Sequence, residues 1–107
     1  MKNYLIIGGS SGIGASLVKQ LQSKGVNVYS TYNKNKITSP DKNVFYHQLD
    51  VTKEDIDLSF LPDQIDGFAY CPGSINLRPF HRIEPADFLQ DYELQVLGAI
   101  KILQRIL

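Results

Sequence analysis

The residues with the clearest chemical use form a glycine-rich segment, Gly-Gly-Ser-Ser-Gly-Ile-Gly, over residues 8–14. An apolar run over residues 4–7 precedes it, and apolar residues at helical spacing follow it. Glycines permit positive φ in a tight turn and let the backbone approach a ligand closely. A helix that begins in such a turn directs free N–H groups and a partial positive charge at an anion. We therefore predict a pyrophosphate-binding turn shaped by Gly8, Gly12 and Gly14.

The same segment matches two other motifs. Residues 8–12 satisfy Gly-x-Ser-x-Gly, the nucleophile elbow of hydrolases, with Ser10 as nucleophile and His81 as a candidate triad member. Only seven residues precede Gly8, whereas a hydrolase places earlier strands and an oxyanion loop before its elbow. A serine hydrolase acting through Ser10 is therefore kept only as a further alternative. A phosphate-binding Walker loop is excluded, because Ala15 follows Gly14 where that loop requires lysine.

Alternating strand and helix patterns position this turn. Short apolar runs bounded by turn residues predict strands over residues 4–7, 26–31, 44–49 and 65–71. Helical spacing predicts helices over 13–24 and 85–107, with a short helical turn starting at Thr52. The last helix is predicted to be amphipathic from its apolar residues Phe88, Leu89, Tyr92, Val96, Ile100, Leu103 and Leu107. Such alternation indicates an α/β protein with a parallel sheet, so we expect a truncated three-layer Rossmann-type fold with strand order 3-2-1-4.

Length and composition restrict the other classes of protein. The 107 residues allow one domain, with 43% hydrophobic and 21% charged residues. The single cysteine, Cys71, excludes an intrachain disulfide and is typical of a reducing compartment, so we expect a cytoplasmic protein without a signal peptide. No apolar run approaches the ~18 residues of a membrane span. Basic residues do not cluster with aromatic ones, and histidines and cysteine lack metal-ligand spacing, so we expect no nucleic-acid partner and no metal.

Charge is unevenly distributed although the formal net charge is zero. Residues 1–49 carry a balance of +5, and residues 50–93 carry a balance of −7. The basic half contains the glycine segment. An excess of positive charge there favours an anionic ligand, although solvated surface charges explain the same pattern.

Three segments together make nearly the whole chain resemble the N-terminal part of the short-chain dehydrogenase/reductase family. They are the glycine segment, the sequence Leu-Asp-Val-Thr over residues 49–52, and the Pro72–Gly73 turn after the fourth predicted strand. The resemblance implies a nicotinamide dinucleotide lying across the carboxyl ends of the strands. It also implies hydride transfer to or from a small carbonyl or alcohol substrate.

The resemblance also assigns roles to individual residues. The Asp50 carboxylate would hold the adenine amino group, and the Val51 N–H would meet the adenine ring. Pro72 and Gly73 would flank the nicotinamide ribose. The phosphates would be lined by Ser10, Ser11 and Ile13.

The segment after the second predicted strand bears on the choice of cofactor. An acidic residue there hydrogen-bonds the ribose 2′-hydroxyl of NAD and repels the 2′-phosphate of NADP. Residues 30–36 contain no acid. Tyr32, Asn33 and Lys34 offer a hydroxyl, an amide and a cation to a phosphate. We therefore predict NADP as the cofactor, with NAD as the alternative.

The family's remaining catalytic groups, a serine and a Tyr-x-x-x-Lys motif, normally lie beyond the long helix. We therefore expect residues 1–107 to form one dinucleotide-binding domain of a longer fold, with the parent protein as the enzyme. The family's catalytic asparagine aligns with Gln95, whose amide is one methylene further from the backbone. This departure leaves a non-catalytic dinucleotide-binding module as the alternative. The family commonly pairs through the long helix, which predicts a homo-oligomer.

Overall fold

A computed structural model describes residues 2–9, 12–33, 42–53, 55–72 and 80–107 of the chain. Its strands form one parallel sheet in the order β3-β2-β1-β4. The strands are β1 Asn3–Ile7, β2 Asn27–Tyr32, β3 Val44–Gln48 and β4 Gly67–Tyr70. The predicted fold class and strand order are therefore confirmed. Because all four strands run the same way, their carboxyl ends meet at one edge of the sheet.

The central strand β1 is buried on both faces of the sheet. Leu5 pairs with Tyr29 of β2 on one side and with Phe68 of β4 on the other. Leu5, Ile6 and Ile7 are all buried. Such a continuous apolar run is typical of a strand with helices on both faces, because successive side chains point to opposite sides.

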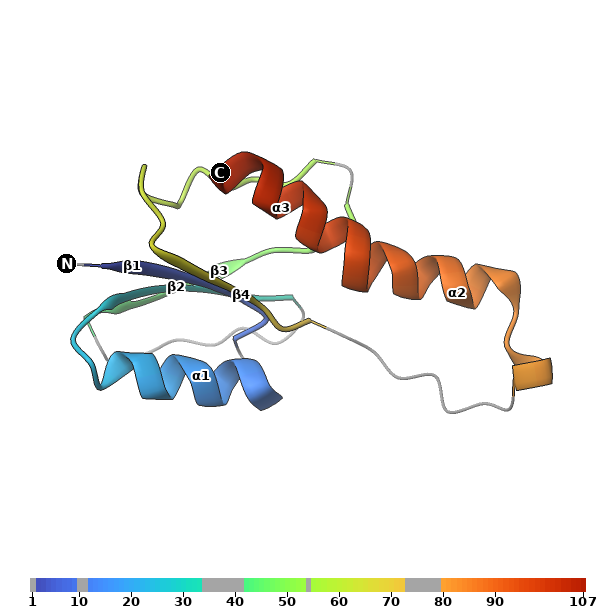
Figure 1. Cartoon of the computed structure of the whole chain (residues 1–107), viewed down its shortest axis with the longest axis horizontal. Helices are drawn as coiled ribbons and strands as arrows, with labels where there is room; N and C mark the ends of the chain where they lie inside the picture. The colour runs from blue at the N-terminus through green and yellow to red at the C-terminus, as the bar shows by residue number, and fades with distance from the viewer. Residues whose placement is uncertain (1, 10–11, 34–41, 54, 73–79) are drawn as a thin grey trace.

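Helices cover the two faces of the sheet (Figure 1). Helix α1, Gly12–Gln22, packs on one face, where its Val18 joins a core cluster with Ile6, Val28 and Val44. The other face is covered by the C-terminal helical segment, which consists of α2 Pro85–Tyr92, the π-helical turn η2 Glu93–Leu97 and α3 Gly98–Ile106. The core cluster on that face contains Leu5, Ile7, Leu49, Val51, Ile56 and Ile102. The arrangement is the predicted three-layer sandwich.

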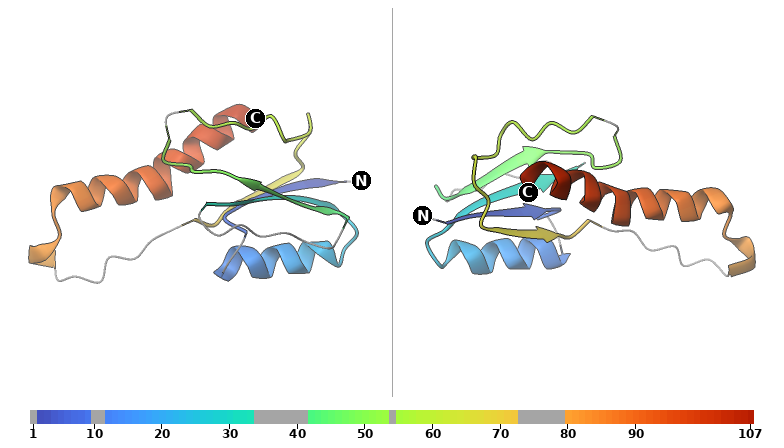
Figure 2. Two further views of the ribbon diagram at one scale, coloured as in Figure 1. Left: turned by 180° about the vertical axis from the view of Figure 1, so that it is seen from behind. Right: turned by 45° about the horizontal axis from the view of Figure 1, so that its top comes forward.

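The C-terminal helical segment reaches beyond the sheet. Helix α3 lies over the strands, whereas α2 projects past their carboxyl ends, as both turned views also show (Figure 2). Helix α2 contains no buried residue, and the short 3-10 helix Phe80–Arg82 precedes it. The projection makes the molecule elongated, with extents of 49 × 25 × 20 Å.

Two predicted elements differ from the structure. The short helix expected from Thr52 is wrong, since the described residues between β3 and β4 form turns and bends. Oδ1 of Asp50 accepts hydrogen bonds from the Thr52 N–H (3.0 Å) and the Thr52 hydroxyl (2.6 Å), a local side-chain alternative to a helix start. Strand β4 is shorter than predicted. Its backbone hydrogen bonding continues outside the assigned bounds, from the Cys71 N–H to the Ile7 carbonyl (2.8 Å).

The long helix exists, but it does not bury the apolar residues that predicted it. Most of them are exposed, with Leu89 at 65% and Phe88, Tyr92, Val96, Ile100 and Leu107 also on the surface. Gly98 and Ile102 are buried instead, and Leu94 and Ile106 pack against the same core. These four residues recur every four positions, which places them on one face of the helix. The helix therefore carries two apolar faces, and the sheet takes the one that includes glycine.

Candidate functional site

The glycine turn leaves β1 in a conformation that favours glycine. Gly8 has a φ of +81° and Gly12 a φ of +58°, both in the left-handed region. The Gly8 N–H donates to Oγ1 of Thr31 (3.0 Å), and the Gly9 N–H donates to the Thr31 carbonyl (3.1 Å). Thr31 is buried near the carboxyl end of β2. The turn is therefore anchored to the neighbouring strand.

Close backbone packing holds the start of α1 against this turn. A Cβ atom on Gly14 would overlap the carbonyl oxygen of Gly8, and one on Gly9 would overlap the hydroxyl of Ser30. That hydroxyl is buried and donates to the Ile6 carbonyl (3.1 Å). Glycine at position 14 therefore lets the start of α1 pack tightly against the turn. Its contact with a phosphate stays a prediction.

A small pocket opens at the carboxyl edge of the sheet, beside the turn. Its lining comes from the ends of all four strands and from the π turn, and consists of Ile7, Gly8, Thr31, Tyr32, Asn33, Leu49, Val51, Pro72 and Leu94. None of these side chains is charged, and most are apolar. A Cβ atom on Gly8 would lie 2.9 Å from the backbone nitrogen of Pro72, so glycine also lets the first and fourth strands end side by side. An apolar slot with a few polar groups suits a flat ring.

The structure brings together part of the predicted site. Five predicted residues line the pocket, namely Gly8, Tyr32, Asn33, Val51 and Pro72. The others in the described chain lie around it, namely Gly12, Ile13 and Gly14 in the first turn of α1, Asp50 after β3, and Gln95 in η2. The side chain of Ile13 is 82% exposed. Ser10, Ser11, Lys34 and Gly73 lie outside the described residues.

Asp50 sits between two residues of the pocket lining, Leu49 and Val51, and is itself half-buried. The hydrogen bonds from Thr52 to its Oδ1 hold the carboxylate in a fixed orientation beside the pocket. Val51 is buried, so its side chain belongs to the core as well as to the pocket. The Leu49 N–H donates to the Tyr32 carbonyl (2.9 Å) and ties this segment to the end of β2.

Four residues of the pocket lining were missed by the sequence analysis. Ile7, Thr31 and Leu49 each adjoin a predicted site residue, so extending each predicted segment by one position finds them. Leu94 also adjoins a predicted residue, Gln95, but it belongs to a helix far along the chain and reaches the pocket only through the fold. Gln95, its neighbour, is exposed and does not line the pocket.

Cys71 lies between β4 and the pocket residue Pro72 and packs against the core on the α1 face. Burial raises the pKa of its thiol. A higher pKa keeps the thiol protonated at neutral pH, and the protonated form is a poor nucleophile. Cys71 therefore acts as a small packing residue directly after β4.

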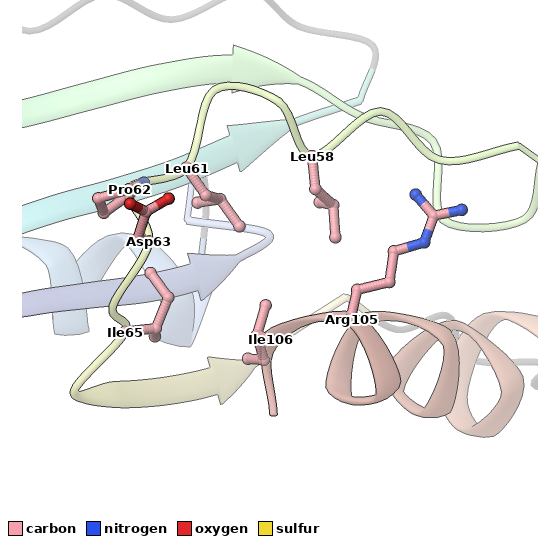
Figure 3. A pocket seen from close by; sticks show the side chains of 7 residues that line it. All are labelled: Leu58, Leu61, Pro62, Asp63, Ile65, Arg105 and Ile106. Atoms are coloured by element: carbon pink, nitrogen blue, oxygen red, sulfur yellow. The ribbon is translucent and has the colours of Figure 1, made fainter.

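A second hollow, with a volume of about 230 Å³, lies between the loop that precedes β4 and the end of α3 (Figure 3). Leu58, Leu61 and Ile65 face Ile106 across it, and Asp63 and Arg105 stand at opposite ends. The Arg105 guanidinium donates to the Ile56 carbonyl, which joins the helix to the loop. No residue predicted from the sequence as functional lines this hollow, which lies toward the amino end of β4.

The described residues contain neither a membrane-spanning helix nor a cluster of metal ligands. No helix in this part of the chain is long and apolar enough to cross a membrane. The same residues contain no group of three or more histidine, cysteine, aspartate or glutamate side chains that could hold a metal ion.

Comparison with known proteins gives matches among solved structures. No family model matches the sequence, and no curated protein matches it. A short-chain dehydrogenase family protein from Francisella tularensis is 26% identical, with a TM-score of 0.80 over 97% of this chain and 44% of its own. A short-chain dehydrogenase/reductase from Burkholderia multivorans with bound NADP is 16% identical, with a TM-score of 0.80 over 96% of this chain and 51% of its own.

A third structure, a short chain dehydrogenase from Leptospira borgpetersenii with bound NAD⁺, is 21% identical. Its TM-score is 0.81 over 98% of this chain and 44% of its own. The chain thus has the fold of a part of the short-chain dehydrogenases and spans about half the length of those it matches.

Proposed function

We propose that the chain is the cofactor-binding half of an NAD(P)-dependent oxidoreductase of the short-chain dehydrogenase/reductase type. The observation that carries this proposal is the pocket at the carboxyl edge, where the glycine turn meets the segments after β2, β3 and β4. Open α/β sheets bind dinucleotides at this edge, where the strand order reverses between neighbouring crossovers. In this sheet the reversal lies between β1 and β4.

The residues present fit the adenosine side of a dinucleotide. The apolar pocket between Val51, Tyr32 and Leu94 suits an adenine ring, and the tethered Asp50 carboxylate suits its amino group. The first turn of α1 has no acidic side chain, which favours a pyrophosphate at its N-terminus. Ser10, Ser11 and Ile13 would line the phosphates, and Pro72 and Gly73 would border the nicotinamide ribose.

We propose NADP rather than NAD as the preferred cofactor. The described residues at the end of β2, Tyr32 and Asn33, are uncharged, and Lys34 follows them in the sequence. The solved relatives carry either cofactor, NADP in one case and NAD⁺ in another, so their fold leaves the choice to these residues. Titration with both cofactors tests the preference. Equal or tighter binding of NAD would contradict it.

The reaction we propose is hydride transfer between the cofactor and a small carbonyl or alcohol, with this chain binding and orienting the cofactor. The bound dinucleotide supplies or accepts the hydride. Gln95 stands where the family has its catalytic asparagine, and a non-catalytic dinucleotide-binding module is the second candidate because of this residue. The gene sequence that follows the codon for Leu107 distinguishes the enzyme from the non-catalytic module. A serine and a Tyr-x-x-x-Lys helix encoded past Leu107 support the enzyme, and a stop codon there supports the module.

The proposal is tested by competition between the two halves of the cofactor. We expect the chain to bind NADPH, followed by the fluorescence of its reduced nicotinamide, and 2′-phospho-ADP-ribose to displace it. Nicotinamide mononucleotide should compete much more weakly, because the described pocket serves the adenosine side. A chain that binds neither NADPH nor NADH would overturn the proposed function.

We also propose that the protein self-associates through the C-terminal helical segment and that it is cytoplasmic. The exposed apolar residues of that segment, Phe88, Leu89, Tyr92, Val96 and Ile100, support self-association, because water-facing apolar clusters commonly mark interfaces. Cell fractionation tests the location, and light scattering tests the oligomeric state.

A further inference from the structure

The C-terminal helical segment changes its hydrogen-bond register at one point. In a regular α-helix the Gly98 N–H would donate to the Leu94 carbonyl, four residues earlier. It donates instead to the carbonyl of Glu93, one residue further back, so Glu93–Leu97 forms a π turn. Such turns are rare within α-helices and are frequent at functional sites.

The side chain of Tyr70 hydrogen-bonds the Leu94 carbonyl, which Gly98 would contact in a regular α-helix. Its hydroxyl donates a hydrogen bond to the Leu94 carbonyl, across 24 residues of sequence. Tyr70 ends strand β4 and is half-buried, and burial raises its pKa to about 12. The hydroxyl therefore keeps its proton, and remains a donor, through the neutral pH range.

Gly98 makes this contact possible. A Cβ atom at that position would overlap the Tyr70 hydroxyl and would lie 3.1 Å from Cβ of Val51. The helix backbone therefore approaches β4 and the segment after β3 closely enough for a side-chain hydroxyl to reach a helix carbonyl. Gly98 is buried there, and Ile102 below it belongs to the core.

The hydrogen bond from Tyr70 affects the pocket because its acceptor residue, Leu94, belongs to the pocket lining. Leu94 lines the pocket with Val51 and Pro72, while its carbonyl accepts the hydrogen bond from Tyr70. If the π turn relaxed to α-helix while Ile102 stayed in the core, the residues before it would rotate by about 100° around the helix axis. That rotation would carry Leu94 out of the pocket lining.

We propose that Tyr70 is a positioning residue, which selects the π register of residues 93–97 and thereby places Leu94 in the pocket wall. Its effect on dinucleotide binding rests on the proposed function. Its effect on the helix register does not, so the two can be tested separately.

The test is Tyr70→Phe in the full chain, with Tyr29→Phe as the matched control. Tyr29 packs against the same core cluster and stacks on Phe45, away from the pocket lining. We expect Tyr70→Phe to weaken NADPH binding about fivefold, which corresponds to the loss of one ordinary hydrogen bond. The control should bind as the wild type does.

The register is read by NMR, from the coupling across the hydrogen bond between the Gly98 amide nitrogen and its carbonyl acceptor. We expect the Glu93 carbonyl as acceptor in the wild type and the Leu94 carbonyl in Tyr70→Phe. An unchanged acceptor in Tyr70→Phe would overturn the inference, as would equal loss of binding in both variants. If the wild type binds no NADPH, the proposed function fails, and the coupling measurement alone decides the role of Tyr70.

Gly98→Ala gives a second, independent measurement. The added Cβ should displace the Tyr70 hydroxyl and lower the free energy of unfolding. In the Tyr70→Phe background the same substitution should cost less, because the overlapping oxygen is gone. Equal costs in the two backgrounds would show that Gly98 does not serve Tyr70, and would contradict the proposed contact.

Discussion

The two faces of the sheet are held by different means. On the α1 face, the turn and the helix start pack backbone against backbone, because glycine removes the side chains that would intervene. On the other face, the helix meets the sheet through a tyrosine hydroxyl and a π turn. The first arrangement connects residues within one short segment. The second connects β4 to a helix that comes much later in the chain.

The candidate pocket lies where the two arrangements meet. Gly8 brings the first kind of contact to its rim, and Leu94 brings the second. Any ligand there would depend on both. Substitutions that damage one face at a time therefore separate their contributions, and the following predictions run from the largest expected effect to the smallest.

Gly14→Val and Ile102→Ala should have the two largest effects. In the first, the added side chain would overlap the Gly8 carbonyl, a backbone atom that cannot move without opening the turn. We expect a loss of about 3 kcal/mol in the free energy of unfolding, the upper range for overpacking. Urea denaturation measures it. Gly12→Ala is the control, since its Cβ meets no atom within 4 Å and only its φ of +58° is unfavourable. Equal losses would contradict the close-packing account.

Ile102→Ala should cost about 3 kcal/mol, because it leaves a cavity in the core under the helix. Ile102 is fully buried, whereas Ile100 is 42% exposed on the other apolar face. Ile100→Ala should change the free energy of unfolding by less than about 0.5 kcal/mol, as surface substitutions usually do. Thermal or urea unfolding compares the two variants. The same cost at both positions would refute the assignment of the buried face.

Ile100→Glu tests the proposed use of the exposed face. If copies of the chain pair through it, the added charge should weaken self-association at least about tenfold, equivalent to about 1.4 kcal/mol. Light scattering across a concentration series measures this. Gln20→Glu is the control, because it adds the same charge on exposed α1, across the sheet. A wild-type protein that stays monomeric at every concentration would contradict the proposed self-association.

Asp66→Asn should have the smallest effect, confined to acid pH. The Asn3 N–H (2.7 Å) and the Gln64 amide (2.9 Å) donate to its carboxylate, and these hydrogen bonds lower its pKa below 3.8. A lowered folded-state pKa gives stability that is complete above the unfolded value and is lost as pH falls through the folded value.

The free energy of unfolding should therefore depend less on pH in Asp66→Asn than in the wild type below about pH 4. Unfolding curves at several acid pH values measure this. Asp63→Asn, in the same loop, controls for the loss of one negative charge. An identical acid dependence in Asp66→Asn and the wild type would show that the contact with Asn3 adds nothing.

Much of the fold followed from local patterns. Buried apolar runs such as residues 4–7, and the order of strands and helices, were sufficient for the parallel sheet and its strand order. The short helix at Thr52 failed because Asp50 offers the backbone a competing side-chain partner. The long helix was found, yet its buried face was not, because two apolar stripes satisfy the same spacing.

The candidate site likewise contains residues that the sequence predicted and one that only the fold places there. Five predicted residues line the pocket because each ends a strand or lies within three residues after its end, and parallel strands bring those ends together. Asp50 and Gln95 lie beside the pocket rather than in its lining. Leu94 directly precedes the predicted Gln95, and only the fold decides that Leu94, rather than Gln95, lines the pocket.

The sequence by itself determined the glycine turn, the strands and the edge at which a ligand would lie, since these depend on backbone freedom and on the period of apolar residues. Tertiary structure alone decided which face of the long helix is buried and how its register shifts. The physical reason is that these features depend on contacts between distant residues, above all Tyr70 with Leu94 and Gly98 with Val51. Their geometry exists only once the helix lies on the sheet.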